Sequence, residues 1–150
     1  MKRIITIIMC LSFLFVSMPS ASAAENREVV FEEEHTLENG LRVVDTVTVS
    51  SNNRSSTVTA NRERDFYDGD TLVAYICFEA TFRYDGSTVS VASKTVTNTD
   101  TYDGWEYVQN SFTSSGGTVT LNAKLTKWFI LNTSFTMTLS CDKDGNISYT

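Results

Sequence analysis

The residues that could do chemistry in this chain are few and scattered. The sequence has one histidine, His35, and no G-x-S-x-G motif, HExxH motif or phosphate-binding glycine loop. A catalytic cysteine needs a basic partner, and Cys77 and Cys141 are both far from His35 in sequence. Carboxylates such as Asp103 and Glu106 could meet in a small hydrolase, but no spacing selects such a pair. We therefore expect a non-catalytic protein, with a carboxylate-dependent hydrolase as the alternative.

Three aspartates in the segment DFYDGD are candidate metal ligands. Asp65, Asp68 and Asp70 surround a glycine, and calcium takes flexible oxygen ligands of this kind. The segment lacks both the D-x-D-x-D-G spacing and the distal glutamate of an EF-hand loop. A solvated turn is the favoured interpretation, calcium is the alternative, and no other cofactor is indicated.

Four aromatic residues could bind a sugar ring. Flat aromatic platforms on β-sandwiches stack against glycans, and the candidates here are Tyr102, Trp105, Tyr107 and Trp128. The alternative is that one tryptophan fills the core and the tyrosines flank it. The expected function is a binding module for an extracellular protein or a cell-surface glycan, with a structural or inhibitory exported protein as a further alternative.

The first 23 residues have the pattern of a secretory signal peptide. Lys2 and Arg3 precede an apolar run from Ile4 to Val16, and the small residues 21–23 predict cleavage before Ala24. A run of about 13 apolar residues is too short to span a bilayer. We expect a mature protein that is secreted and not inserted in the membrane.

The remaining residues, 24–150, are enough for one domain with a hydrophobic core. The leader carries two of the 12 basic residues and none of the 18 acidic ones, so its removal changes the formal net charge from −6 to −8. Such acidity repels phosphate backbones, and the basic residues form no cluster beyond Arg62 and Arg64, which alternate with Glu63 and Asp65. Nucleic acid is therefore not expected as a partner.

Short strands separated by tight turns dominate the rest of the chain. Every even position from Leu72 to Tyr84 is apolar or aromatic, which predicts a strand with one face in the core. The acidic run Glu32–Glu34 is typical of an exposed sheet edge. Turn signals stand at Asn39-Gly40, Asp85-Gly86, Asp103-Gly104 and Asp144-Gly145. The pattern predicts an antiparallel, immunoglobulin-like β-sandwich of eight or nine strands, with acidic strands in 24–56 and the main sandwich in 57–150.

The two cysteines outside the leader are expected to form a disulfide because export exposes thiols to oxidation. A Cys77–Cys141 bridge would close a loop of about 65 residues and stabilise the fold by about 4 kcal/mol. Cys141 lies on the apolar face of its predicted strand, whereas Cys77 lies opposite the apolar face of its own. The bridge therefore requires either a β-bulge near Cys77 or a pairing outside the main core.

Three segments resemble a known family. FEATFRYDGSTVSVAS, DGWEY and the closing MTLSCDKDGNIS are similar to segments of small exported proteins of Gram-positive, Clostridia-like bacteria that carry a domain of unknown function. The resemblance runs from Leu72 to the end of the sequence. It implies a β-sandwich and bacterial export, and it transfers no functional residue. The segment from Glu25 to Ser56 lies outside it, which leaves open whether those strands join the same sheets.

Overall fold

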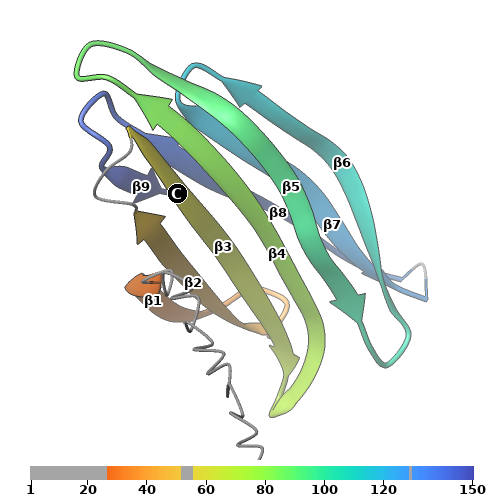
Figure 1. The fold of residues 1–150 in the computed structure, drawn as a ribbon. Coiled ribbons are helices and arrows are strands. Elements are labelled where there is room, and N and C mark those ends of the chain that lie inside the picture. Colours follow the sequence, from red (N-terminus) through yellow and green to blue (C-terminus); the bar gives the residue numbers. More distant parts are fainter. Residues whose placement is uncertain (1–26, 52–55, 129) are drawn as a thin grey trace, which may run out of the picture.

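The chain folds into two antiparallel sheets that pack face to face (Figure 1). The computed structural model describes residues 27–51, 56–128 and 130–150, so the predicted leader and its cleavage site lie outside the described residues. The strands are β1 (Arg27–Thr36), β2 (Arg42–Ser51), β3 (Thr57–Asp68), β4 (Thr71–Tyr84), β5 (Val89–Thr101), β6 (Trp105–Ser115), β7 (Thr118–Lys127), β8 (Leu131–Cys141) and β9 (Ile147–Tyr149). Within these ranges, no helix is long and apolar enough to cross a membrane.

The strand order follows the sequence. One sheet has the order β1-β2-β3-β4-β5 and the other β6-β7-β8-β9, so every paired strand is a neighbour along the chain. The predicted all-β sandwich with nine strands is confirmed. Its connections form two meanders, whereas immunoglobulin domains use Greek-key connections, so the likeness to that fold lies in the two layers. The acidic strands β1 and β2 belong to the same sheet as β3.

Alternation of apolar residues places the core between the sheets. On β4 the even residues from Ala74 to Phe82 are fully buried, as the period of two predicts. Odd residues of β7 and β8 face them from the second sheet. Those residues are Val119, Leu121, Ala123, Leu125, Phe135, Met137, Leu139 and Cys141.

The turn between β5 and β6 links the two sheets. Asp103 and Gly104 have positive φ angles of 54° and 79°, as a two-residue type I′ turn requires, and the Trp105 amide donates to the Tyr102 carbonyl at 3.0 Å. This turn ends the first sheet and begins the second. The chain therefore closes the sandwich on its β5/β6 side.

The opposite side of the first sheet ends at β1. Glu32, Glu33 and Glu34 are exposed on this outermost strand, so the predicted charged edge is confirmed. A bulge interrupts its pairing with β2 between Val29 and Phe31. The Phe31 ring contacts the Tyr149 ring of β9 at a centroid distance of 4.1 Å, which connects the far edges of the two sheets.

A buried group of charged residues joins the sheets beside this contact. Asp45 of β2 accepts hydrogen bonds from Arg64 of β3, from Nε to Oδ1 at 2.8 Å and from Nη2 to Oδ2 at 2.7 Å. The Arg62 guanidinium lies 3.5 Å from Asp45 Oδ1. Its Nη1 donates to the carbonyl oxygens of Thr138 and Thr150 in the second sheet. We call Asp45, Arg62 and Arg64 the ionic clasp.

The structure predicts that the clasp depends on its single carboxylate. Asp45→Asn would remove the carboxylate that faces the buried Arg62 and the largely buried Arg64, which costs about 3–5 kcal/mol of unfolding free energy. The control is Glu34→Gln, because the exposed Glu34–Arg42 ion pair contributes only about 0.2–1 kcal/mol. Urea unfolding of both variants measures the difference. Equal losses would contradict a structural role for the clasp.

The predicted Cys77–Cys141 disulfide is wrong: both thiols are free and buried. A bulge does occur beside Cys77, but the extra residue is Thr97 on β5, and the burial of the even residues of β4 continues unbroken. Cys77 therefore stays on the outer face of the first sheet. Cys141 belongs to the core between the sheets. Strand parity thus keeps the two sulfur atoms on different faces.

The thiols should be unreactive in the folded protein. Burial raises the pKa of Cys77, and burial followed by the charge of Asp142 raises the pKa of Cys141 to about 11, so little thiolate forms near neutral pH. Titration with a disulfide reagent at pH 8 should label neither thiol until denaturant is added, and should then label both without reductant. If the denatured, unreduced protein shows no reactive thiol at Cys77 and Cys141, the two cysteines form a disulfide and the free thiols are contradicted.

Candidate functional site

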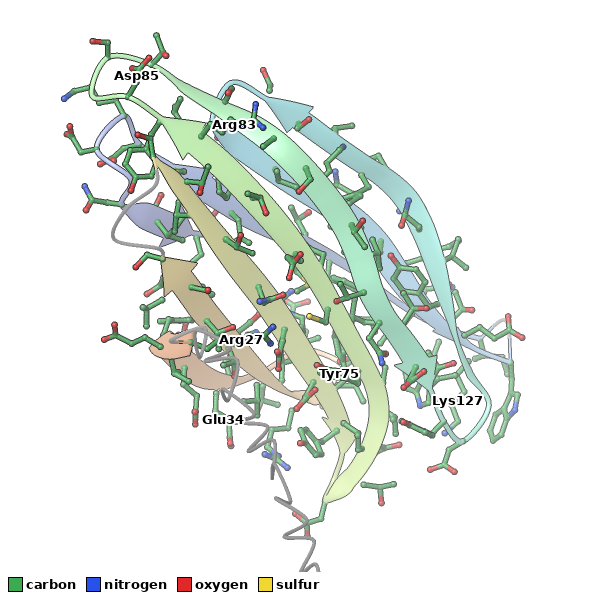
Figure 2. The ribbon with its side chains drawn as sticks, in the orientation of Figure 1. Arg27, Glu34, Tyr75, Arg83, Asp85 and Lys127 are labelled. Atoms are coloured by element: carbon green, nitrogen blue, oxygen red, sulfur yellow. The ribbon has the colours of Figure 1, made fainter. Side chains whose placement is uncertain are left out.

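The predicted aromatic residues gather at one end of the sandwich. The β5–β6 turn and the β7–β8 turn lie beside each other there, and Lys127 marks this end in Figure 2, opposite the end marked by Asp85. Trp105 opens β6 and pairs with Lys127, the last residue of β7. The sheet register therefore brings the two tryptophans, which are 23 positions apart, to the same corner.

The two tryptophans have opposite environments. Trp105 is 4% exposed and packs in the core, whereas Trp128 is 69% exposed. Tyr107 is partly buried against the core, and Tyr102 is exposed. The four residues therefore do not form one platform: the alternative expectation, that one tryptophan fills the core, holds for Trp105, and Tyr107 flanks it. Tyr102 and Trp128 are the members that face solvent.

Lys127 lies between the two indole rings. Its Nζ atom is 5.5 Å from the centroid of Trp105 and 4.9 Å from the centroid of Trp128. Both distances suit a cation–π interaction, because the ring face carries negative potential. The ammonium group therefore joins the buried and exposed tryptophans and keeps a positive charge at this corner.

Gly104 leaves room for the exposed indole. A Cβ atom on Gly104 would lie 2.9 Å from Trp128 Nε1, closer than van der Waals contact allows. Trp128 itself has a φ of 50°, a left-handed conformation that is unfavourable for a bulky residue. The Trp128 indole therefore lies against Gly104, and the left-handed backbone conformation of Trp128 costs free energy.

Large aliphatic side chains extend the exposed surface. Ile130 is 80% exposed and Leu131 is also exposed, and the Ile130 amide donates to the Lys127 carbonyl at 3.1 Å to close the turn. We call Tyr102, Trp128, Ile130 and Leu131 the tryptophan tip. Trp128, Ile130 and Leu131 stand close together in the β7–β8 connection, and exposed apolar side chains that are grouped in this way mark interaction surfaces.

Comparison with protein-family models, curated proteins and solved structures finds no significant match to this chain. The resemblance to small exported Gram-positive proteins stays a prediction.

Two hollows lie away from the tip. One, of about 380 Å³, is lined by the ionic clasp and by Phe31, Glu33, His35, Tyr149 and Thr150. Its Asp45 carboxylate contacts both arginines of the clasp. The other, of about 350 Å³, lies at the Asp85 end and is lined by Ser56, Thr57, Arg83, Tyr84, Asp85, Thr88 and Ser90.

The three aspartates of DFYDGD do not converge. Asp65 lies within β3, Asp68 ends that strand, and Asp70 follows in the exposed turn. In the described part of the chain, no three histidine, cysteine, aspartate or glutamate side chains group as metal ligands. Burial, followed by the charge of Glu63, raises the pKa of Asp65, while the Tyr67 hydroxyl donates to it at 3.4 Å. Burial and a like charge therefore account for the raised pKa of Asp65 without a bound metal ion.

Sequence reasoning missed Lys127, Ile130 and Leu131 as parts of the site. The available signal was a lysine followed by four large apolar residues at positions 128–131, where two strands of alternating pattern meet. The structure places Trp128, Ile130 and Leu131 at the connection between β7 and β8, where their side chains are exposed.

Gly104→Ala should displace the Trp128 indole. The new methyl group would collide with Nε1, and the positive φ makes alanine unfavourable by about 1 kcal/mol. Gly86→Ala is the matched control, since its φ of 81° carries the same backbone cost and no atom lies within 4 Å of its Cβ. Both variants should lose similar stability, but only Gly104→Ala should shift the Trp128 Nε1–H resonance in a ¹H–¹⁵N spectrum. An unchanged resonance would contradict the close packing.

Proposed function

We propose that this protein is an exported, non-catalytic binding module that contacts its partner through the tryptophan tip. The observation that carries the proposal is the exposure of Trp128 and Ile130 at one turn, 69% and 80%, on a scaffold that buries its other tryptophan. Leaving such side chains in water forgoes roughly 1.5–3 kcal/mol each relative to burial. A partner that covers them would recover this free energy.

Rigid strands support the tip, as a binding surface requires. Lys127 and Leu131 are paired with each other at the ends of β7 and β8, and Trp105 anchors the corner in the core. A surface whose backbone is already ordered loses little conformational entropy on binding. The geometry therefore supports recognition by a preformed turn.

The chemistry of the tip bears on the two partner classes expected from the sequence. A glycan platform needs flat rings with hydrogen-bonding groups beside them, and Trp128 and Tyr102 supply rings with one polar atom each. Ile130 and Leu131 supply only aliphatic surface. The tip therefore favours a partner with substantial apolar surface over a purely polar polysaccharide.

Retention on bacterial cell envelopes tests the proposal. The exported protein is incubated with envelopes of a Gram-positive host, beside the variant Ile130→Ser/Leu131→Ser and the control Val29→Ser/Val30→Ser. Val29 and Val30 are exposed on β1, at the opposite edge of the first sheet from β5, which leads into the tip. The tip variant should bind about tenfold more weakly, because interface side chains of this size contribute about 1 kcal/mol or more. Equal retention of all three proteins would contradict the proposal.

A further inference from the structure

We propose that the partner of the tryptophan tip is the headgroup region of a lipid bilayer. This inference rests on the proposed function, because it names the partner of the same surface. The contact would be shallow, with the side chains of the tryptophan tip at the level of the headgroups. It differs from a spanning segment, which the sequence argues against.

The side chains of the tip are of the chemical types that a bilayer surface accepts. Ile130, the most exposed, offers aliphatic surface that suits the upper acyl chains. Trp128 and Tyr102 have apolar rings with one polar atom each, the type of side chain enriched at the membrane–water boundary. Lys127 lies behind Trp128, where its ammonium group could meet lipid phosphates while its stem lies along apolar surface.

One backbone amide in each of the two turns is already hydrogen-bonded within the protein. The Ile130 amide donates to Lys127, and the Trp105 amide donates to Tyr102. An amide moved from water without a partner costs several kcal/mol, so these internal bonds remove a main obstacle to partial dehydration. The tip can therefore leave water with little cost from these two amides.

The charge of the molecule predicts which lipids it prefers. The expected net charge of −8 for residues 24–150 repels an anionic surface, while Lys127 supplies a local positive charge. Binding should therefore depend on apolar contact. It should occur on zwitterionic phosphatidylcholine and persist at high salt, where ion-pairing between exposed charges is screened within about 3–5 Å.

Vesicle binding tests the inference in two ways. Sedimentation of the exported wild-type protein with phosphatidylcholine vesicles measures affinity, at low salt and at 0.5 M salt (about a 4 Å screening length). Emission of the Trp105→Phe variant reports Trp128 alone, and vesicles with brominated acyl chains test its depth. We expect a blue shift and stronger quenching by bromine near the headgroup than by bromine near the chain end.

The tip variants supply the comparison. Ile130→Ser/Leu131→Ser should weaken vesicle binding about tenfold, because it removes the aliphatic area that enters the bilayer. Val29→Ser/Val30→Ser should bind as the wild type does. If the wild-type protein does not sediment with vesicles, or if the tip variant binds them equally well, the bilayer inference is overturned.

The two proposals fail in different ways. Tip-dependent retention on delipidated cell walls or on an isolated envelope protein, without vesicle binding, would overturn the bilayer inference and leave the proposed function standing. Retention that never depends on the tip would overturn both. Tip-dependent binding to both vesicles and envelopes supports both.

Discussion

The ionic clasp is the interaction on which the two-layer arrangement depends. The chain itself closes the sandwich at the Asp103-Gly104 turn, but among the described residues no connection closes the side where β1 and β9 meet. There Arg62 lies between the sheets and donates to the carbonyls of Thr138 and Thr150. Burial lowers the pKa of Arg62 and the charge of Asp45 opposes that effect, so the carboxylate compensates part of the desolvation cost. The clasp and the Phe31–Tyr149 contact together hold the open side.

Because the two sheets are held together on both sides, the fold tolerates at one end a surface that lowers its stability. The left-handed conformation of Trp128 and the exposed Ile130 lower stability locally, and the core and the clasp must offset that loss. Strained or apolar surface that a fold retains is a reason to infer function at that place. This division, with stability from the inter-sheet layer and recognition from a turn, is common in β-sandwich proteins.

The sequence predicted the strands and turns because their signals are local. The even residues of β4 alternate over 14 positions, and Asp103-Gly104 takes the two positive φ angles that its residue types favour. The Asn39-Gly40 turn shows the limit of such a signal. Only Gly40 has a positive φ there, and Asn39 Oδ1 instead accepts a bond from the Leu41 amide at 3.2 Å. The chain turns where predicted, but the Gly40 amide donates to the Leu37 carbonyl, so the turn spans Leu37 to Gly40 and needs only one positive φ.

The parts that sequence reasoning missed depend on contacts between distant residues. Arg62 and Arg64 share the inner face of β3 with Val58, Ala60 and Phe66, but only the pairing with Asp45 and the carbonyls of the second sheet explains why charge is tolerated there. The disulfide prediction was wrong because it rested on the oxidising environment expected for an exported protein. Strand parity, which places Cys77 and Cys141 on different faces, decides the outcome. Both tryptophans follow strand signals, and only the inter-sheet packing decides that Trp105 is buried and Trp128 is not.

The most direct test of the account is the separate fluorescence of the two tryptophans. Trp105→Phe leaves Trp128 as the reporter, and Trp128→Phe leaves Trp105. We predict red-shifted emission and strong acrylamide quenching from the first variant, and blue-shifted, weakly quenched emission from the second. A protected Trp128 in the isolated protein would contradict the exposed tip, and with it the binding surface on which both proposals depend.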